Sequence, residues 1–294
     1  MQKIIPNLWF DKEAKQAAEF YTSVFPDSKV THVTTLHDTP SGDTEIVSFT
    51  IWGQPFMGIS AGPLFKLNPS ISFHVKCKTK DEVDVIWKKL SQGSMILMEL
   101  GAYPWSERYG WLQDQYGLSW QVIYEGEREP IQRITPALMY VGSVSGKAKE
   151  AINLYTSIFQ DAKVIHATYY GKGEEPNQEG MIKYATFALL GQEFVANDSA
   201  YEHRFSFNEA ISFVVSCDTQ EEIDNYWEKL SAVPEAEQCG WLKDQFGLSW
   251  QVVPSNMSAM LQNGDRAQID RLTQAILGMK KLDIAKLQEA AEAQ

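Results

Sequence analysis

Residues Gly110–Ile123 read GWLQDQYGLSWQVI, and Gly240–Val253 read GWLKDQFGLSWQVV, so that only three of the fourteen paired positions differ. The Asp-x-x-Gly core predicts a tight turn in both places. Glycine supplies the positive φ of the turn, and Asp114 and Asp244 are placed to accept hydrogen bonds from the turn's backbone. A turn repeated so closely indicates an internal duplication, and the rest of the chain is interpreted around it.

The residues after each turn alternate as a half-buried strand does. This alternation places Trp120 and Trp250 on one face, which we expect to be packed against helices. Gln121 and Gln251 then lie on the opposite face. The glutamines are therefore the first candidate functional residues.

Composition sets broad limits. The chain has 294 residues, 44% of them hydrophobic, and a net charge of −12. The length predicts about two domains. The acidic charge argues against a nucleic acid or an anionic membrane as partner, and the sequence has neither an apolar run of about 18 residues nor a signal-peptide pattern. Cys77 and Cys217 match across the repeat, which favours small core residues over a disulfide. We expect a soluble protein of the cytoplasm.

A strand–helix–three-strand pattern recurs along the chain. Lys3–Phe10 predicts a strand, and apolar residues from Ala14 to Phe25 recur at helical spacing before three further strands. The pattern restarts at Ser70, where Thr79 and Glu82 form a capping box. Four βαβββ units result, two in each half, so the predicted fold class is α+β.

The repeat also suggests domain boundaries. We predict domains at residues 1–128 and 129–256, followed by a helical C-terminal tail at 257–294. Asp265 and Asp283 are the expected N-caps of two tail helices. The halves are expected to pack as a pseudo-symmetric pair, and pairing of whole chains into a homodimer is left open.

Further motifs accompany the repeated turn: LWFD and AEFYTSVFP within Leu8–Pro26, FNEAISF at Phe207–Phe213, TQEEID with YWEKLS within Thr219–Ser231, and CGWLKDQFGLSWQ at Cys239–Gln251. Together they resemble the vicinal oxygen chelate superfamily, which includes glyoxalases, bleomycin-resistance proteins and extradiol dioxygenases. More closely, the sequence resembles its PhnB-like branch, catalogued as demethylubiquinone methyltransferase. The resemblance implies two glyoxalase/bleomycin-resistance-like domains, in which paired βαβββ units form a curved sheet around a cup.

Active members of that superfamily hold a divalent metal in the cup, typically with a His on the first strand of a unit and a Glu on the last. Here Gln121 and Gln251 stand at the Glu position, and no His stands at the first-strand position. The fourth strand offers Ser60 in one half and Asp198 in the other. Because neutral amides are weaker ligands than carboxylates, we predict no metal and no cofactor.

The histidines divide into two groups. His32 and His166 match across the repeat, so they are candidates for a base in the cup, although packed strand residues are the simpler interpretation. His74, paired with Val214 in the repeat, is interpreted as incidental. His37 and His203 have no repeat partner and are interpreted in the same way.

The favoured hypothesis is a protein that binds a small apolar or aromatic molecule in a metal-free cup. The candidate ligand-binding residues are Gln121, Gln251, Trp9, Phe10, Trp105, Tyr140, His32 and His166. Trp105 belongs to an insertion in the first half that either lines the mouth of a pocket or lies on the surface.

Whether the protein is an enzyme is left open. A metal-dependent lyase, isomerase or dioxygenase is the alternative, with His32, His166 and Asp198 as the candidate residues of an unorthodox site. A ligand-free scaffold is a third reading. A methyltransferase is less favoured, because the glycine-rich and acidic strand ends of an S-adenosylmethionine fold are absent.

Overall fold

The computed structural model describes residues 2–128 and 130–293. Residues 1 and 129, which begin the two predicted domains, and residue 294, which ends the predicted tail, lie outside the described residues. The chain forms two compact units. Unit 1 comprises residues 1–22, 28–66 and 208–294, and unit 2 comprises residues 23–27 and 67–207.

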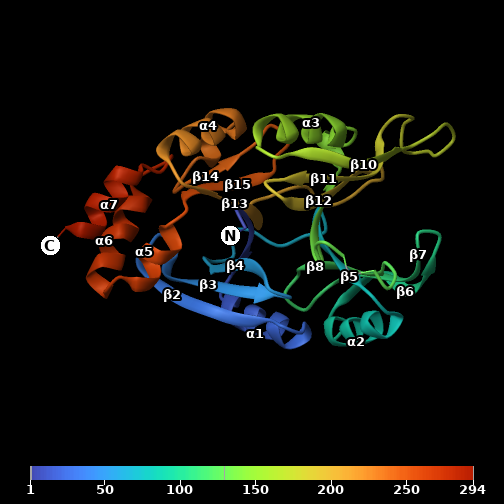
Figure 1. Cartoon of the computed structure of the whole chain (residues 1–294), viewed down its shortest axis with the longest axis horizontal. Helices are drawn as coiled ribbons and strands as arrows, with labels where there is room; N and C mark the ends of the chain where they lie inside the picture. Colours follow the sequence, from blue (N-terminus) through green and yellow to red (C-terminus); the bar gives the residue numbers. More distant parts are fainter. Residues whose placement is uncertain (1, 129, 294) are drawn as a thin grey trace. The chain divides into compact units, whose positions relative to one another are not determined.

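Unit 1 contains a mixed sheet in the order β14-β15-β13-β1-β4-β3-β2 (Figure 1). Its strands are β1 (Ile4–Phe10), β2 (Lys29–Thr39), β3 (Gly42–Ile51), β4 (Gln54–Ser60), β13 (Ile211–Cys217), β14 (Trp241–Lys243) and β15 (Ser249–Pro254). Its helices are α1 (Ala14–Val24, whose last two residues belong to unit 2), α4 (Gln220–Leu230), α5 (Met257–Asn263), α6 (Arg266–Leu277) and α7 (Ile284–Glu292), with a 3₁₀ turn η2 (Pro234–Ala236).

Unit 2 contains the corresponding sheet in the order β10-β11-β12-β9-β5-β8-β7-β6. Its strands are β5 (Ile71–Cys77), β6 (Met95–Tyr103), β7 (Ser106–Gln113), β8 (Ser119–Tyr124), β9 (Ile134–Tyr140), β10 (Lys163–Tyr169), β11 (Ile182–Leu189) and β12 (Gln192–Asp198). Its helices are α2 (Lys80–Leu90) and α3 (Ala148–Ile158), with a 3₁₀ turn η1 (Gly142–Val144).

The sheets join the two halves of the sequence. At the centre of unit 1, β1 pairs antiparallel with β13, and at the centre of unit 2, β5 pairs antiparallel with β9. Each sheet therefore takes one unit from each half, and the compact units differ from the predicted ranges 1–128 and 129–256. Three units have the predicted βαβββ order, but in the fourth the 3₁₀ turn η2 and two strands, β14 and β15, follow α4. The first unit partners the fourth and the second partners the third.

The repeated turn is built as the sequence predicts. Oδ1 of Asp114 accepts hydrogen bonds from the backbone N–H groups of Tyr116 (2.8 Å) and Leu118 (3.1 Å), and Oδ2 accepts one from the indole of Trp120 (2.8 Å). Asp244 makes the same three bonds in unit 1, at 2.9, 3.0 and 3.0 Å. Both carboxylates are buried, so each turn is fixed to the core strand that follows it.

Local signals also set the helix starts and one class of hairpin. Thr79 and Thr219 cap α2 and α4, and each accepts from the N–H three residues on. The hairpins that follow β3 and β11 turn at the residue pairs Trp52-Gly53 and Leu190-Gly191. Trp52 and Leu190 take positive φ values of 48° and 49° beside Gly53 and Gly191. Two consecutive positive φ values match the twist of a two-residue hairpin.

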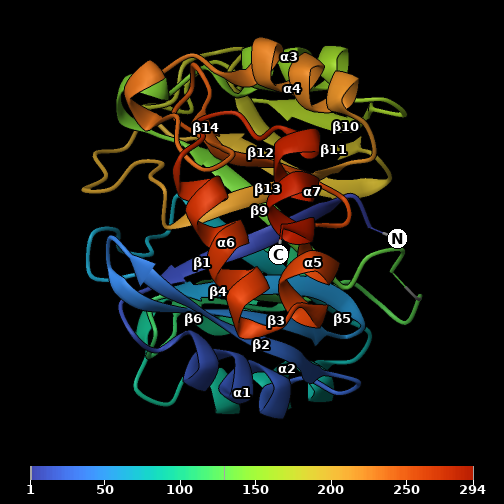
Figure 2. The same ribbon diagram turned by 90° about the vertical axis from the view of Figure 1, so that its left-hand side faces the viewer.

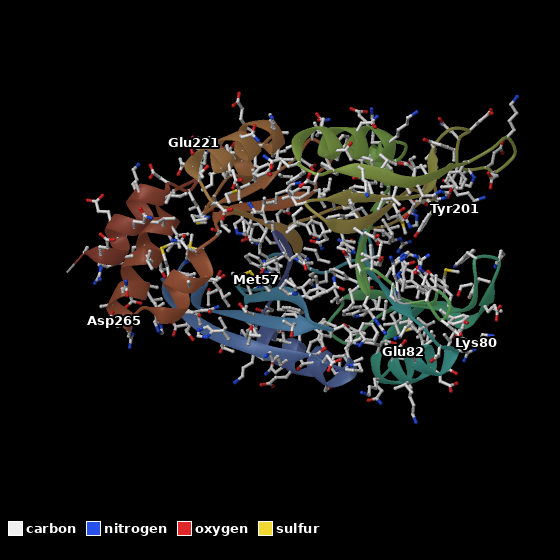
Figure 3. The ribbon with its side chains drawn as sticks, viewed as in Figure 1. Met57, Lys80, Glu82, Tyr201, Glu221 and Asp265 are labelled. Atoms are coloured by element: carbon white, nitrogen blue, oxygen red, sulfur yellow. The ribbon has the colours of Figure 1, made fainter. Side chains whose placement is uncertain are left out.

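The C-terminal tail packs against the sheet of unit 1, where α5 and α6 contact β2 (Figure 2). Asp265, labelled in Figure 3, and Asp283 cap α6 and α7 as predicted, whereas α5 was not expected. The tail core consists of Met257, Leu261, Leu272, Leu282 and Leu287, and it contacts Leu36 and Val253 of the sheet. Gly240, with φ of 85°, lets the tail approach closely, because an added Cβ would lie 3.0 Å from a methyl carbon of Leu282. No helix in the described residues is long and apolar enough to cross a membrane.

Replacing Asp244 by Ala is expected to lower the free energy of unfolding by about 2–4 kcal/mol, because two backbone N–H groups and the Trp250 indole lose a buried acceptor. Urea unfolding measures this loss. The exposed Asp43, in a surface pair with His37, is the control, and Asp43→Ala should change stability by less than about 0.5 kcal/mol. Equal effects of the two variants would contradict the assignment.

Candidate functional site

One face of the unit 1 sheet surrounds a cavity of about 170 Å³. Alternate residues of seven strands contribute to it, as expected for one face of a curved sheet. We call this face cup 1. Met57, labelled in Figure 3, is one of its residues. The sheet residues that line it are Ile5, Thr34, Leu36, Ile46, Ser48, Met57, Ile59, Val214, Ser216, Trp241, Gln251, Val253 and Pro254.

Gln251 is the polar centre of cup 1. Its Nε2 donates to Oγ of Ser212 at 2.8 Å, which fixes the direction of the amide. Its Oε1 has no hydrogen-bond partner among residues 2–128 and 130–293. Trp241 stands beside it on the next strand and makes an edge contact with Trp9, at 6.1 Å between ring centroids. The free acceptor therefore lies in an apolar and aromatic setting.

The tail forms the roof of cup 1. Met257 and Leu261 of α5, Ile276 of α6 and Leu282 line the cavity opposite the sheet. The roof is held by backbone bonds of 2.8 Å from Cys239 N–H to the Met279 carbonyl and from Gly240 N–H to the Lys280 carbonyl. Access to Gln251 is therefore controlled by the tail as well as by the sheet.

Cys239 is the only cysteine among the lining residues of this cavity. Partial burial raises the pKa of its thiol above the ordinary value of 9.0, so little thiolate is present at neutral pH. Cys77 and Cys217 are buried core residues, as the sequence predicts. Cys239 is thus a chemical reporter inside cup 1.

The corresponding face of unit 2, which we call cup 2, carries a different set of side chains. The repeat places Thr135, His74 and Lys76 where cup 1 has Ile5, Val214 and Ser216. Tyr184 stands where cup 1 has Ile46, three residues before the stacked Phe187 on β11, just as Ile46 lies three residues before Phe49 on β3. Cup 2 is consequently more polar than cup 1.

Gln121 of cup 2 differs from its repeat partner in its bonds. Its Nε2 donates to Oγ of Ser72 at 2.7 Å, as in cup 1, but its Oε1 accepts from the hydroxyl of Tyr109 at 2.6 Å. Burial raises the pKa of the Tyr109 phenol, which keeps the hydroxyl protonated as a donor. Cys239 replaces Tyr109 in the other repeat, and this one exchange leaves the amide oxygen free only in cup 1.

His74 is the second distinctive residue of cup 2. Its ring lies parallel to Tyr184 at 6.4 Å, and its side chain is almost fully buried. Burial, helped by the charge of Lys76 and opposed by a hydrogen bond with Gln121, lowers the pKa of His74 from 6.5 to about 4. Lys76 is itself paired with Glu193 at 3.1 Å, with both side chains mostly buried.

The aromatic residues predicted to contact a ligand are dispersed. Trp9 donates to the Gly62 carbonyl and packs on Phe65 beside cup 1 without lining its cavity. Phe10 and Tyr140 are buried on the opposite face of their strands, because they alternate with the cup-facing positions. Trp105 is 58% exposed at the tip of the β6–β7 hairpin, stacked on Tyr103.

The paired histidines are not in the cavity either. His32 is half-buried on β2 and His166 is exposed on β10, and neither lines the cavity of cup 1. Asp198, the third candidate residue of the metal-dependent enzyme hypothesis, is fully buried. It accepts from the backbone N–H groups of Gly146, Ala148 and Ile182, so it fixes the start of α3.

The sequence did not identify two features that distinguish the cups, namely His74 in cup 2 and the roof of cup 1. His74, interpreted as incidental, lies at the centre of cup 2, opposite Gln121 and Thr135. Its mismatch with Val214 was the available signal, because residues 70–91 and 210–231 otherwise repeat closely. The roof from α5 carried no sequence signal.

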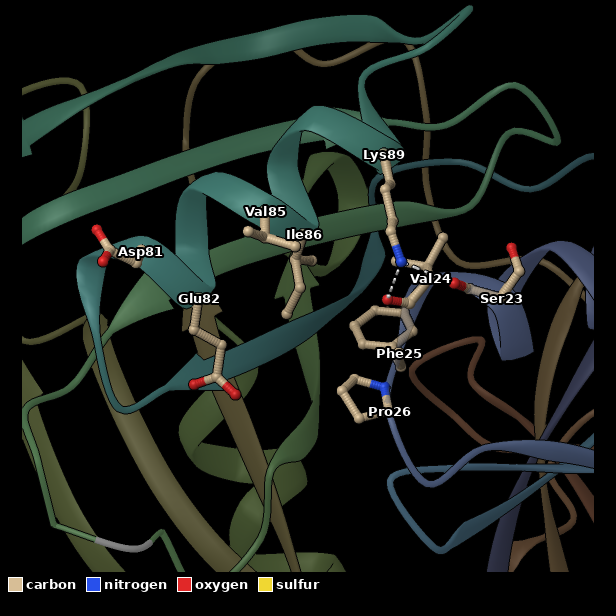
Figure 4. Close-up of a pocket in the computed structure, with 9 residues that line it drawn as sticks. All are labelled: Ser23, Val24, Phe25, Pro26, Asp81, Glu82, Val85, Ile86 and Lys89. Carbon is tan, nitrogen blue, oxygen red and sulfur yellow. Dashed lines mark hydrogen bonds between the residues drawn. The ribbon is translucent and has the colours of Figure 1, made fainter.

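A separate groove of about 370 Å³ lies on unit 2 beside α2 (Figure 4). It is lined by apolar side chains, including Phe25 and the exposed Val85. Two of its charged groups are already bonded: Lys89 donates to the Ser23 and Val24 carbonyls, and Glu82 pairs with Arg133. We assign no site to this groove.

Neither cup offers a ligand set suited to a divalent metal. In cup 1 the residues at the central register positions are Ile5, Val214 and Gln251, which supply one amide oxygen. In cup 2 the imidazole of His74 has an amide and a hydroxyl for neighbours. Within the described ranges no group of three or more His, Cys, Asp or Glu side chains is placed to hold a metal. The residues therefore do not fit the superfamily's metal.

Solved structures share the fold. Glyoxalase I from Zea mays has a TM-score of 0.54 at 12% identity, over 85% of this chain and 91% of that one. The chain belongs to the family described as 3-demethylubiquinone-9 3-methyltransferase, whose model matches residues 2–123 and 132–253.

A shorter protein of known structure is similar to part of the chain. The protein described as putative 3-demethylubiquinone-9 3-methyltransferase, PhnB protein, from Bacillus cereus is 38% identical over 42% of this chain and 99% of its own length, with a TM-score of 0.39. No curated protein matches the chain. The family description names an activity. The function of this chain is inferred from the residues of its own site.

His74 predicts a specific pH dependence of stability. Its folded pKa of about 4 lies below the ordinary 6.5, so as the pH falls below 6.5 the unfolded chain gains a proton that the folded protein does not. The free energy of unfolding should therefore fall by about 1 kcal/mol between pH 7.5 and 5.5, and by about 3 kcal/mol once pH 4 is reached. Urea unfolding of the protein and of His74→Phe, compared from pH 7.5 to 5.5, isolates this contribution. Identical slopes would contradict it.

Proposed function

We propose that cup 1 binds a small, largely apolar molecule of about the size of one ring, which donates a hydrogen bond to Oε1 of Gln251. The observation that carries the proposal is this amide oxygen, oriented by Ser212 and left without a partner in the described chain. A ligand with an O–H or N–H group would satisfy it. A ligand with only acceptors would not.

The size of the cavity supports a small ligand. An apolar cavity of about 150 Å³ in another protein accommodates benzene. Cup 1, at about 170 Å³, is of that size, and most of its lining is aliphatic, sulfur-containing or aromatic. A phenol or a small aromatic amine fits both the volume and the acceptor.

The difference between the repeats supports cup 1 as the site for this ligand. In unit 2 the Tyr109 hydroxyl already occupies the amide oxygen of Gln121. In unit 1 the shorter Cys239 leaves the equivalent oxygen open to a ligand. The hydroxyl of Tyr109 thus models the donor that we expect from the ligand.

The lining favours binding over acid–base catalysis. Among the described residues, the lining of cup 1 contains no carboxylate, imidazole or amine. General acid–base catalysis relies on such groups near the reacting atoms. The residues in hand therefore support recognition, with the thiol of Cys239 as the one reactive group.

Phenol should protect Cys239 from alkylation, because a ligand on Gln251 occupies the space that the reagent must enter. We expect saturable protection, about five- to tenfold weaker in Gln251→Leu and weak with toluene, because each lacks one side of the hydrogen bond. Iodoacetamide labelling followed by peptide mass spectrometry measures it. Gln121→Leu is the matched variant in the other repeat, and phenol should protect Cys239 in it as in the unchanged protein. Protection by phenol and toluene alike would overturn the role of Gln251.

Filling the cavity should abolish binding without unfolding the protein. Ile46→Tyr copies Tyr184, which the equivalent strand of unit 2 accommodates. We expect loss of phenol protection at Cys239 with a cost in stability of about 1–3 kcal/mol from overpacking. Thermal unfolding separates the two effects. A folded Ile46→Tyr protein that still shows phenol protection would place the ligand outside cup 1.

A further inference from the structure

Cup 2 contains two buried polar atoms that lack partners. Nδ1 of His74 and Oγ1 of Thr135 make no hydrogen bond in the part of the chain that the structure describes. Their side chains are 93% and 99% buried, since the residues are 7% and 1% exposed. Buried polar atoms are nearly always bonded in native proteins, so two of them together indicate something that binds between them.

The register brings the two atoms to one place. His74 on β5 faces Thr135 on β9 directly across the antiparallel pair, and both belong to the cup face of the sheet. On its other side His74 neighbours Gln121 on β8, and Tyr184 lies over its ring. The cross-strand spacing of such a pair, about 5 Å between Cβ atoms, suits a single bridging group.

The chemistry of the neighbours selects that group. His74 is neutral at pH 7, so one ring nitrogen carries a proton and the other accepts. The interaction with Gln121 raises the pKa of His74, which is the direction expected when a ring N–H donates to the amide oxygen. Since Nδ1 has no partner, this proton lies on Nε2, and Nδ1 is the acceptor. Thr135 can donate or accept.

Charged ligands fit poorly. A carboxylate has no proton to donate to Nδ1. A cation would meet the ammonium of Lys76, and the one carboxylate close by, that of Glu193, is paired with that ammonium. A hydroxyl group fits both atoms, because it donates to Nδ1 and accepts from the Thr135 hydroxyl.

We propose that cup 2 is a second binding site, specific for a neutral hydroxyl group held between Nδ1 of His74 and Oγ1 of Thr135. The ligand class is a small uncharged alcohol or phenol, with the Tyr184 ring as one wall of the site. This site is independent of cup 1, because it uses other residues in the other unit. The two repeats then serve two ligands rather than one ligand twice.

Nitrogen-15 NMR of the histidine side chains tests the proposal on the full chain. The chain has five histidines, and the signals of His74 are identified as the set that is lost in His74→Phe. Methanol, ethanol and phenol are the probes, with fluorobenzene as the probe that lacks a donor. We expect a saturable shift of Nδ1 of His74 with at least one hydroxylic probe and none with fluorobenzene.

Matched variants define the outcome. Thr135→Val should weaken the response about fivefold or more, and Thr135→Ser should retain it, because serine keeps the hydroxyl. Gln251→Leu should leave the response unchanged, so failure of cup 1 is distinguishable from failure of cup 2. No saturable shift with any probe would mean that a water molecule fills the gap and would overturn the proposal. So would an equal response of Thr135→Val.

Discussion

The carboxylate buried under each repeated turn is the constraint on which the sheets depend. Asp114 and Asp244 each hold two backbone N–H groups and a tryptophan indole, all away from water. A charge so buried is stable only when its acceptor sites are filled, so the turn and the strand after it must form together. The position of each tryptophan then fixes which face of that strand carries the glutamine.

Duplication supplied two similar cups, and a few exchanges gave them different chemistry. Where the second repeat has Cys239, the first has Tyr109, whose hydroxyl occupies the amide oxygen of Gln121. Val214 and Ile5 make cup 1 apolar at the positions where His74 and Thr135 make cup 2 polar. Similar frameworks thus form one apolar cup and one polar cup. The turn and core residues set the fold, while the cup-facing residues remain free to vary.

The tail makes a further difference between the units. It covers cup 1 with apolar side chains from α5 and α6, and it fixes itself to the edge of the sheet at Cys239 and Gly240. In unit 2 the corresponding edge carries the long β6–β7 hairpin, with Tyr103 and Trp105 stacked at its tip. The insertion of the first half therefore extends one edge of the unit 2 sheet, whereas the C-terminal tail covers the cup face of the unit 1 sheet.

The sequence alone determined the α+β class, the order of three of the four βαβββ units, the Asp-x-x-Gly turns, the helix caps and the face on which the glutamines lie. These follow from local hydrogen bonds and from alternation within one strand, which involve residues close in the chain. Only the tertiary structure decided which units pair, that α5 roofs Gln251, and that His74 meets Thr135. These contacts join segments far apart in sequence, and their register is set by packing across the sheet, which no local pattern records.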